Sequence, residues 1–271
     1  MVGCAVVKHC TAQSDEVFAY SHHSLDITND SAVKACLEAV RPEVVINCAA
    51  LTDVDACETD SQRAYKVNAH GPETLAANCR HVGALLITIS TDYVFDGTKT
   101  GFYTQRDDPN PISVYGTVKL EGERRAHAAS ARTMIVRTGW VFGEGGRNFL
   151  SKVIEHAQQG AHLKVISDAY GTPTYARDLA VRLRHLAELD LPGVYHVVNS
   201  GDGTSYEGFA RTALAMTSNV SATLESMSMN SLRRPAPRPQ NSRLRCLVSE
   251  AIGLPALPLW EDALKDFAMT G

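Results

Sequence analysis

Two stretches of the chain carry side chains that could do acid–base chemistry. The segment 90–97, Ser-Thr-Asp-Tyr-Val-Phe-Asp-Gly, directly follows the apolar run 84–89. Further on, Tyr115 is followed four residues later by Lys119. Helix neighbours at i and i+4 lie on the same face, so a lysine held there is expected to lower the pKa of the phenol. Tyr115 would then be a proton donor near neutral pH. The pair alone also fits a solvated lysine beside a half-buried tyrosine. The polar residues at the strand end upstream favour the acid–base interpretation.

Composition and charge exclude several other classes of protein. With 271 residues, 44% of them hydrophobic and 21% charged, the chain suits one large domain or two closely joined ones. A formal net charge of −4 gives no sign of the excess positive charge that is typical of nucleic-acid-binding proteins. No apolar stretch approaches the length of a membrane span, and residues 1–4 do not open a signal peptide. We therefore expect a cytoplasmic protein with neither nucleic acid nor membrane as partner.

Cysteine and histidine spacing gives no sign of a metal site or a disulfide framework. The seven cysteines form an odd set without CxxC spacing, which is typical of reduced thiols in a cytoplasmic protein. The ten histidines show no HxxxH or HExxH grouping, so we expect no metal.

Apolar runs alternate with helical patterns along the first two thirds of the chain. Expected strands cover 16–20, 44–48, 84–89, 133–137, 163–166 and 194–198. Expected helices cover 32–40 (capped by Asp30), 61–81 (ended by Gly83), 115–129 and 177–189. Strands alternating with helices of this length indicate βαβ units. The predicted fold is therefore α/β, a Rossmann-like doubly wound parallel sheet.

The texture of the sequence changes after about residue 201. A helix at 206–216 and a β-like segment at 222–227 precede a Pro/Arg-rich loop at 233–239, and a final amphipathic helix carries Trp260. We predict a dinucleotide-binding domain at 1–141 with 168–200 returning to it, and a substrate-binding lobe at 142–167 and 201–271. The lobe would cover the carboxyl ends of the strands, where open α/β sheets bind ligands. The Pro/Arg loop is either a solvated connector or a source of arginines for a diphosphate.

Several motifs in fixed order carry a resemblance to a known family. The longest are 89–97, Ile-Ser-Thr-Asp-Tyr-Val-Phe-Asp-Gly; 114–123, Val-Tyr-Gly-Thr-Val-Lys-Leu-Glu-Gly-Glu; and 137–143, Arg-Thr-Gly-Trp-Val-Phe-Gly. Supporting matches lie at 25–28, 41–50, 67–69, 171–176 and 238–244. This set, which spans nearly the whole chain, resembles the extended short-chain dehydrogenase/reductases and, within them, the reductases of dTDP-L-rhamnose synthesis.

The resemblance implies reduction of the C4 ketone of dTDP-4-dehydro-L-rhamnose by NADPH or NADH. Tyr115 would protonate the ketone oxygen, because a developing alkoxide needs a donor at hydrogen-bond range. Lys119 would favour ionisation of Tyr115 and hold the nicotinamide ribose. Thr91 would bond the carbonyl oxygen, although a hydroxyl that caps the strand end is the competing interpretation.

Two further residues are expected at the sugar. Asp92 would face it, and the competing interpretation is an Asx-turn that starts the loop. Trp140 would line the hexose site unless it is a core residue. The family usually has Ser at the position of Gly139, so the backbone beside Trp140 is expected to differ.

The cofactor residues follow from the same resemblance. Asp26 and Ile27 should flank the adenine, with a helix N-cap as the alternative role of the aspartate. Ala50, Leu51 and Thr52 end a strand where small residues let the backbone approach a dinucleotide. Their alternative role is tight helix–sheet packing.

The family opens with a strand and a Gly-rich turn that holds the pyrophosphate. Here Gly3 matches the last glycine of that turn, so Met1, Val2 and Gly3 are the expected phosphate contacts. Roughly a dozen residues, including the first strand, are absent by comparison with that fold. A start site placed too late and a protein that has lost tight cofactor binding both fit this difference.

Other functions remain open from the sequence. A non-catalytic subunit similar to the β-subunit of methionine adenosyltransferase, or a nucleotide-sugar epimerase, would share parts of the pattern. The turn at 21–24, Ser-His-His-Ser, carries neither an acidic residue nor an arginine, so it predicts dual use of NADPH and NADH or a modest NADPH preference. The pattern is also compatible with a homodimer.

Overall fold

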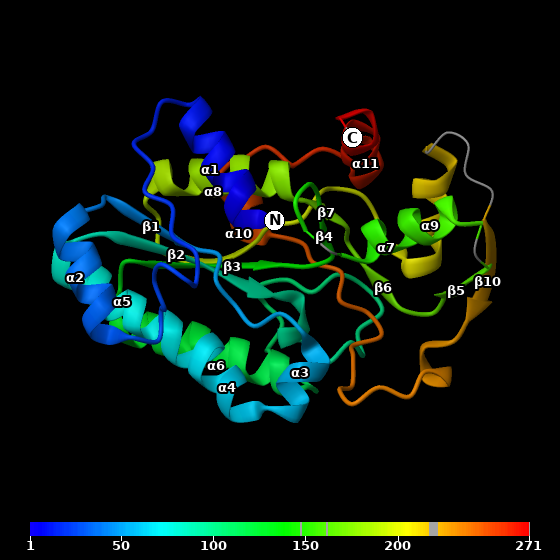
Figure 1. Ribbon diagram of the computed structural model, residues 1–271, viewed down its shortest axis with the longest axis horizontal. Coiled ribbons are helices and arrows are strands. Elements are labelled where there is room, and N and C mark those ends of the chain that lie inside the picture. The colour runs from blue at the N-terminus through cyan, green and yellow to red at the C-terminus, as the bar shows by residue number, and fades with distance from the viewer. Residues whose placement is uncertain (147, 161, 217–221, 271) are drawn as a thin grey trace.

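Four parallel strands form the central sheet of the computed structural model, which describes residues 1–146, 148–160, 162–216 and 222–270 (Figure 1). The strands are β1 (Val44–Asn47), β2 (Leu85–Thr91), β3 (Thr133–Thr138) and β8 (Gly193–His196), in the order β1-β2-β3-β8. In the register of the sheet, Ile87 pairs with Ile46 on one side and Met134 on the other. These strands are rich in Val and Ile, as strands buried on both faces must be.

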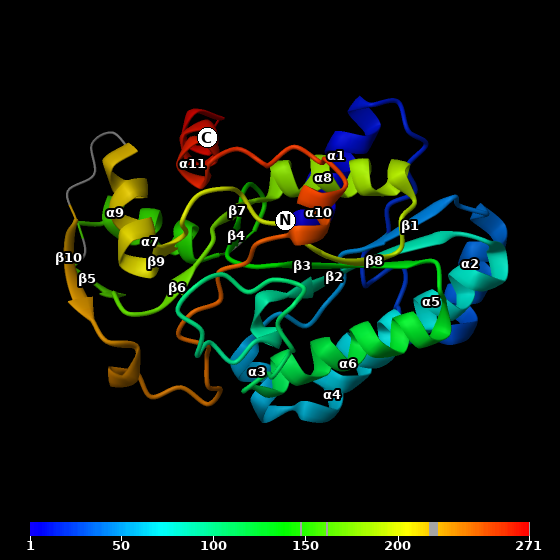
Figure 2. The same cartoon turned by 180° about the vertical axis from the view of Figure 1, so that it is seen from behind.

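Helices cover both faces of this sheet. On one face lie α1 (Val2–Ala12) and α8 (Ala176–Leu189); on the other lie α2 (Asp30–Val40), α5 (Gly71–Val82) and α6 (Val114–Ala129) (Figures 1 and 2). Side chains alternate across a strand, so Leu85 and Ile87 pack in one core cluster with α1 and α8, while Leu86 packs in the other. The predicted doubly wound α/β fold is confirmed.

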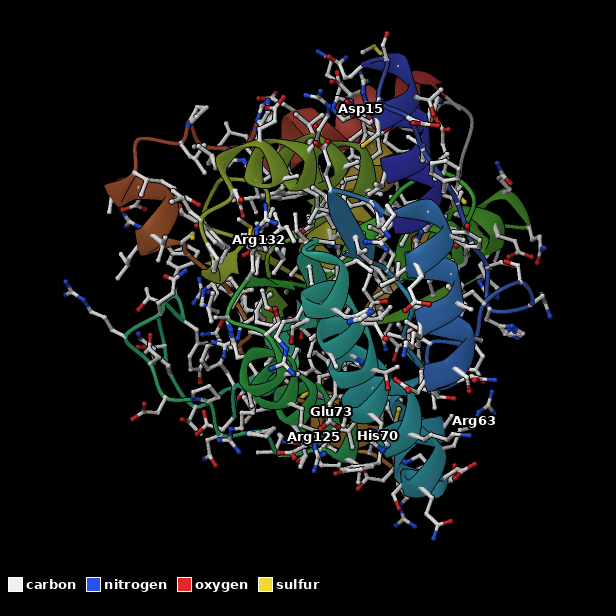
Figure 3. The ribbon with its side chains drawn as sticks, turned by 90° about the vertical axis from the view of Figure 1, so that its left-hand side faces the viewer. Asp15, Arg63, His70, Glu73, Arg125 and Arg132 are labelled. Carbon is white, nitrogen blue, oxygen red and sulfur yellow. The ribbon has the colours of Figure 1, made fainter. Side chains whose placement is uncertain are left out.

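The helical pattern predicted at 61–81 is interrupted near its middle. It comprises α4 (Ser61–Tyr65), a π-helical turn at Lys66–His70, and α5, which ends at Val82 and is capped by Gly83. Gly83 has φ = +79°, a conformation that glycine adopts without a Cβ penalty, so its expected role as terminator is confirmed. At the surface, Arg125 of α6 bonds Glu73 of α5 at 2.9 Å, beside His70 (Figure 3).

Most of the remaining elements pack at the end of the sheet where β2 and β3 terminate. They include α3 (Val54–Thr59), α7 (Phe149–Gln158), α9 (Tyr206–Met216), α11 (Trp260–Thr270), and the parallel pair β5 (His162–Ile166) and β10 (Thr223–Met227). The short helix α10 (Leu247–Ala251) instead lies beside β8. Short pairs join β4 (Val141–Phe142) to β7 (Thr174–Tyr175) and β6 (Tyr170–Gly171) to β9 (Thr204–Ser205). An aromatic core of Phe142, Phe209 and Trp260 holds α9 and α11 together.

Two local predictions are wrong. Residues 16–20 form no strand, and Phe18 and Tyr20 are 53% and 50% exposed. A strand needs a hydrogen-bonded neighbour. In the described part of the chain, β1 pairs only with β2, and residues 16–20 do not join its free edge or any other strand. The cap of α2 is Asn29, whose side chain accepts from the Ala32 N–H, and not Asp30.

No described helix is both long and apolar enough to cross a membrane. All seven cysteines are free thiols. Within the described ranges, no cluster of three or more His, Cys, Asp or Glu side chains could hold a metal ion.

Candidate active site

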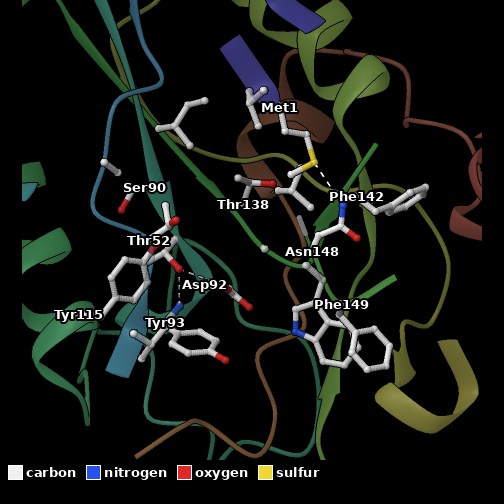
Figure 4. A pocket seen from close by; sticks show the side chains of 18 of the residues that line it. Met1, Thr52, Ser90, Asp92, Tyr93, Tyr115, Thr138, Phe142, Asn148 and Phe149 are labelled. Atoms are coloured by element: carbon white, nitrogen blue, oxygen red, sulfur yellow. Dashed lines mark hydrogen bonds between the residues drawn. The ribbon is translucent and has the colours of Figure 1, made fainter. Parts of the chain in front are cut away.

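A cavity of about 350 Å³ lies at the carboxyl ends of β1, β2 and β3, within the size range of small-molecule sites (Figure 4). In the view of Figure 4, Asp92, Tyr93 and Tyr115 lie on one side, with Met1, Asn148, Phe142 and Phe149 around the opposite side. The lining comprises Met1, Val2, Cys48, Ala50, Thr52, Val54, Ile89, Ser90, Thr91, Asp92, Tyr93, Tyr115, Lys119, Thr138, Gly139, Trp140, Val141, Phe142, Asn148, Phe149, Leu150, Tyr206 and Phe209. The strand ends and the helices α7 and α9 therefore enclose one site.

Tyr115 and Thr91 meet at the base of this cavity. Ser113 caps α6 by accepting from the Gly116 N–H at 3.2 Å, which places Tyr115 in the first helical turn. A Cβ at Gly116 would lie 2.2 Å from the Tyr93 carbonyl oxygen, so only glycine allows α6 this close to the end of β2. Burial raises the pKa of Tyr115 strongly, while hydrogen bonding with Thr91 lowers it. The phenol therefore holds its proton at neutral pH.

Thr91 caps the turn after β2 and also lines the cavity. Its hydroxyl oxygen accepts from the Tyr93 N–H at 3.2 Å, which caps the short 3₁₀ turn Asp92–Val94. The same hydroxyl lines the cavity beside Tyr115. A capping role and a site role are therefore compatible.

Lys119 does not act on Tyr115 as expected. Its ammonium donates to the Ile89 carbonyl oxygen at 2.7 Å, and burial lowers the pKa of Lys119 to about 8, with Glu123 opposing that shift. The nearby charge that acts on Tyr115 at neutral pH is that of Asp92, and it raises the pKa of the phenol. The prediction that the lysine lowers the pKa of the phenol is wrong for this structure, because burial of Tyr115 dominates and the ammonium is directed to a backbone carbonyl.

Asp92 is a buried carboxylate in the cavity wall. Its Oδ1 accepts from the Thr91 hydroxyl at 3.0 Å and its Oδ2 from the Ser242 hydroxyl at 2.5 Å. Burial raises the pKa of Asp92 to about 6, although both hydrogen bonds lower it. Asp92 thus remains charged at pH 7 with its oxygens close to Thr91.

Trp140 lies on the lobe side of the cavity. Its backbone has φ = +49°, a left-handed conformation that is uncommon for a bulky residue. The indole stacks on Tyr206 with ring centroids 3.8 Å apart. A Cβ at Gly171 would lie 2.1 Å from the indole, so the glycine makes room for the ring. Trp140 therefore presents a rigid aromatic surface to the cavity.

The end of the cavity nearest β1 has the features that a dinucleotide phosphate needs. Helix α1 starts at Val2 with no side chain capping its first turn, and Met1 and Val2 line the cavity. The first backbone N–H groups of a helix and its positive dipole end favour anions. Ala50 and Thr52, after β1, line the same region. These residues fit a phosphate group.

Four of the predicted cofactor residues do not line this cavity. Gly3 lies inside the first turn of α1, and Leu51 is turned away, its N–H and C=O both bonded to the Asn68 side chain. Asp26 accepts from the Thr28 N–H and hydroxyl, forming an Asx-turn and not a helix cap. Ile27 packs against α5 beside Gly71.

The Pro/Arg loop is more than a solvated connector, and its predicted role as a source of arginines for a diphosphate stays a prediction. Arg238 forms two hydrogen bonds with the carboxylate of Asp55 in α3, at 2.8 and 3.0 Å. The Ala236 N–H bonds the same carboxylate at 3.0 Å. The loop is thereby fastened to α3, while Arg233 and Arg234 are exposed.

Sequence reasoning found Trp140 but missed the three aromatic residues beside it, Phe149, Tyr206 and Phe209. Tyr206 and Phe209 lie one helical turn apart on α9, and Phe149 begins α7. Their i, i+3 spacing was a detectable signal for a shared face. The direction of that face depends on the tertiary packing of the lobe, which the spacing does not give.

Comparisons with known proteins agree on one family. The family model for the RmlD substrate binding domain matches residues 1–270. A dTDP-4-dehydrorhamnose reductase of Streptomyces griseus is 38% identical over 256 residues, which are 92% of this chain and 84% of that protein. A probable dTDP-4,6-dihydroxy-2-methyloxan-3-one 4-ketoreductase of Streptomyces antibioticus is 35% identical over 98% of this chain and 90% of its own length.

A solved structure shows the same similarity in three dimensions. The dTDP-4-dehydrorhamnose reductase of Bacillus anthracis, in complex with NADP, has a TM-score of 0.96 and 32% identity, covering 100% of this chain and 95% of that one. Sequence, fold and cavity thus point the same way, and the chain belongs to the RmlD substrate binding domain family.

Proposed function

We propose that this chain reduces the C4 ketone of dTDP-4-dehydro-L-rhamnose to give dTDP-L-rhamnose, as an NAD(P)H-dependent oxidoreductase. The observation that carries the proposal is the convergence of Thr91, Tyr115 and Lys119 on one cavity at the carboxyl ends of parallel strands, in a chain of this family. Residues 1–141 and 168–200 would bind the dinucleotide. Residues 142–167 and 201–271 would bind the sugar nucleotide.

Each residue has a physical task in this reaction. Tyr115, kept protonated by burial, would give its proton to the ketone oxygen as negative charge develops there. Thr91 would hold that oxygen beside the phenol. Trp140 and Tyr206 would pack against the hexose, and Asp92 would face its hydroxyls. The aromatic wall would exclude water from the reacting carbon.

The dinucleotide would be held by the residues that fit it. Met1 and Val2 at the start of α1 would bond its phosphates, and Lys119 would bond the ribose hydroxyls. Ala50 and Thr52 would let the protein backbone after β1 approach the dinucleotide closely. When bound, NADPH or NADH supplies the hydride. The homodimer compatible with the sequence stays a prediction, which sedimentation velocity of the purified chain tests.

The test is oxidation of NADPH or NADH, followed by absorbance, with dTDP-4-dehydro-L-rhamnose as substrate. We expect Tyr115→Phe to lower turnover by about 10²–10⁴-fold with little loss of sugar-nucleotide binding. Tyr195→Phe is the matched control: Tyr195 is a buried tyrosine whose hydroxyl donates to the Leu191 carbonyl, away from the cavity. No oxidation by the unmodified chain, or equal turnover of the two variants, would refute the proposal.

A further inference from the structure

Two side chains from different parts of the chain hold the first turn of α6. Ser113, directly before the helix, accepts from the Gly116 N–H at 3.2 Å. Glu58 reaches the same turn from α3, and its Oε2 accepts from the Val114 N–H at 3.0 Å, across 56 positions of the sequence. The first N–H groups of a helix have no partner within the helix, so both bonds satisfy donors that the helix leaves open. The Glu58 bond thereby ties the residue directly before Tyr115 to another helix.

Helix α3 is itself anchored to two other segments of the chain. The Cys57 thiol donates to the Leu51 carbonyl oxygen at 3.6 Å, which ties the helix to the segment after β1. The Asp55 carboxylate accepts two hydrogen bonds from the Arg238 guanidinium, at 2.8 and 3.0 Å, which ties the helix to the Pro/Arg loop. Glu58 is therefore presented to α6 from a helix that is already held in place.

Close packing sets how near α6 lies to its neighbours, and directional bonds set its rotation about its own axis. A Cβ at Gly122 would lie 2.1 Å from the Asn68 carbonyl oxygen, so α6 touches the π-helical turn without a side chain between them. Cys57 of α3 is fully buried and packs in one cluster with Tyr115. Apolar contacts of this kind are non-directional, whereas an N–H···O bond weakens steeply with angle. The phenol hydroxyl lies at the far end of its side chain, so a small rotation of the first turn displaces it more than the backbone.

We propose that Glu58 is a positioning residue for the reduction: by accepting from the Val114 N–H, it holds the first turn of α6 in the rotation that keeps the Tyr115 hydroxyl at the reacting ketone. This inference rests on the proposed function. Glu58 is not one of the described residues that line the cavity, so the surfaces that bind the sugar nucleotide and the dinucleotide do not include it. A misplacement of about 1 Å in a reacting group can cost about 10²-fold in rate. Loss of the Glu58 bond should therefore lower kcat and leave KM little changed.

Three substitutions separate the position of the acceptor from its charge. Glu58→Gln keeps a carbonyl oxygen at the same distance along the side chain, and this oxygen can accept from the Val114 N–H. Glu58→Asp keeps the charge on a side chain that is one methylene shorter, and Glu58→Ala removes the acceptor. If the bond positions Tyr115, the glutamine variant retains turnover and the other two variants lose it. If the charge alone were needed, the aspartate variant would be the active one.

The experiment measures kcat and KM of the three variants with NADPH and dTDP-4-dehydro-L-rhamnose. We expect kcat to fall by about 10–100-fold in Glu58→Ala and Glu58→Asp, with KM for both compounds little changed, and to stay close to that of the unmodified chain in Glu58→Gln. Asp168→Ala is the matched control. Asp168 also accepts from a remote backbone N–H, that of Met229 at 2.7 Å across 61 positions, but it is not one of the cavity residues. Its removal should leave kcat unchanged.

Unchanged kcat in Glu58→Ala, or a loss in Glu58→Gln as large as that in Glu58→Ala, would overturn the proposal. The ¹³C spectrum of tyrosine-labelled protein, with Tyr115→Phe for assignment, gives a readout that needs no turnover. There we expect the ring signal of Tyr115 to shift in Glu58→Ala and Glu58→Asp and to return in Glu58→Gln. A signal that stays in place in all three variants would refute the positioning role. If the unmodified chain fails to turn over substrate while this shift appears, the proposed reduction is wrong and the positioning role holds.

Discussion

A buried ion pair behind the cavity allows a quantitative test of how the site is supported. Glu123 on α6 accepts from Arg137 of β3 at 2.6 and 2.9 Å and from the Ser90 hydroxyl at 2.5 Å. The Arg137 and Glu123 side chains are 7% and 5% exposed. Glu123→Gln leaves the guanidinium buried without its counter-charge, which costs about 3–5 kcal/mol of the free energy of unfolding. For a domain of this size, that corresponds to a fall in Tm of about 6–20 °C.

The same substitution should also reach the chemistry. Glu123 lies one helical turn after Lys119, and its charge raises the pKa of that lysine against burial. Removing the charge therefore lowers the pKa of Lys119 below about 8. The alkaline limb of the pH–rate profile should move to lower pH, by an amount that the profile itself measures.

Glu121→Gln on the same helix is the control. Glu121 pairs with Arg125 at 2.6 Å, but both side chains are 33% exposed, and such pairs contribute at most about 1 kcal/mol. Thermal melts and pH–rate profiles of both variants test whether the buried pair contributes more than the exposed one. Equal losses of Tm would refute the argument from burial. A Glu123→Met, Arg137→Met double variant should recover much of the loss, because apolar replacement of a buried pair leaves no unpaired charge.

Three further outcomes follow from the same coordinates. The kcat/KM of the unmodified enzyme should fall as pH rises through about 8, where Lys119 loses its proton, and the fall should be absent in Lys119→Met. Burial lowers the pKa of His196 to about 4, so on acidification the unfolded chain binds a proton at His196 before the folded chain does. The free energy of unfolding should therefore fall between about pH 6.5 and 4, and His196→Gln should reduce this pH dependence in urea titrations. Gly171→Ala should displace Trp140 and weaken sugar-nucleotide binding by about 10–100-fold, measured by calorimetry, whereas Gly101→Ala, with open space around it, should not.

The sequence predicted what local pattern and chain order determine. Apolar runs located the four sheet strands, because a strand that is buried on both faces of a parallel sheet is apolar along its whole length. Helical spacing and capping residues located α6. Thr91 and Tyr115 could be expected to meet, since Thr91 ends β2 and Tyr115 lies in the first turn of α6, the next long helix along the chain.

Features that depend on tertiary contacts were not readable in this way. Residues 16–20 have the composition of a strand, yet strand formation requires a neighbour and β1 pairs only with β2 in the described sheet. Helical spacing put Lys119 near Tyr115 but did not show that the ammonium bonds the Ile89 carbonyl. Ser242 lies far from Asp92 in sequence, and no local signal links them.

Burial explains why residues outside the cavity determine its chemistry. Desolvation acts against charge on both sides, raising the pKa of Asp92 to about 6 and lowering that of Lys119 to about 8. Asp92 and Lys119 are therefore both ionised only in the pH window between about 6 and about 8. Hydrogen bonds from Ser242 and Thr91 lower the pKa of Asp92, and the charge of Glu123 raises the pKa of Lys119, so these groups widen that window. A chain that kept the Tyr115 and Lys119 motif but lost these supports would lose the window while its sequence pattern stayed intact.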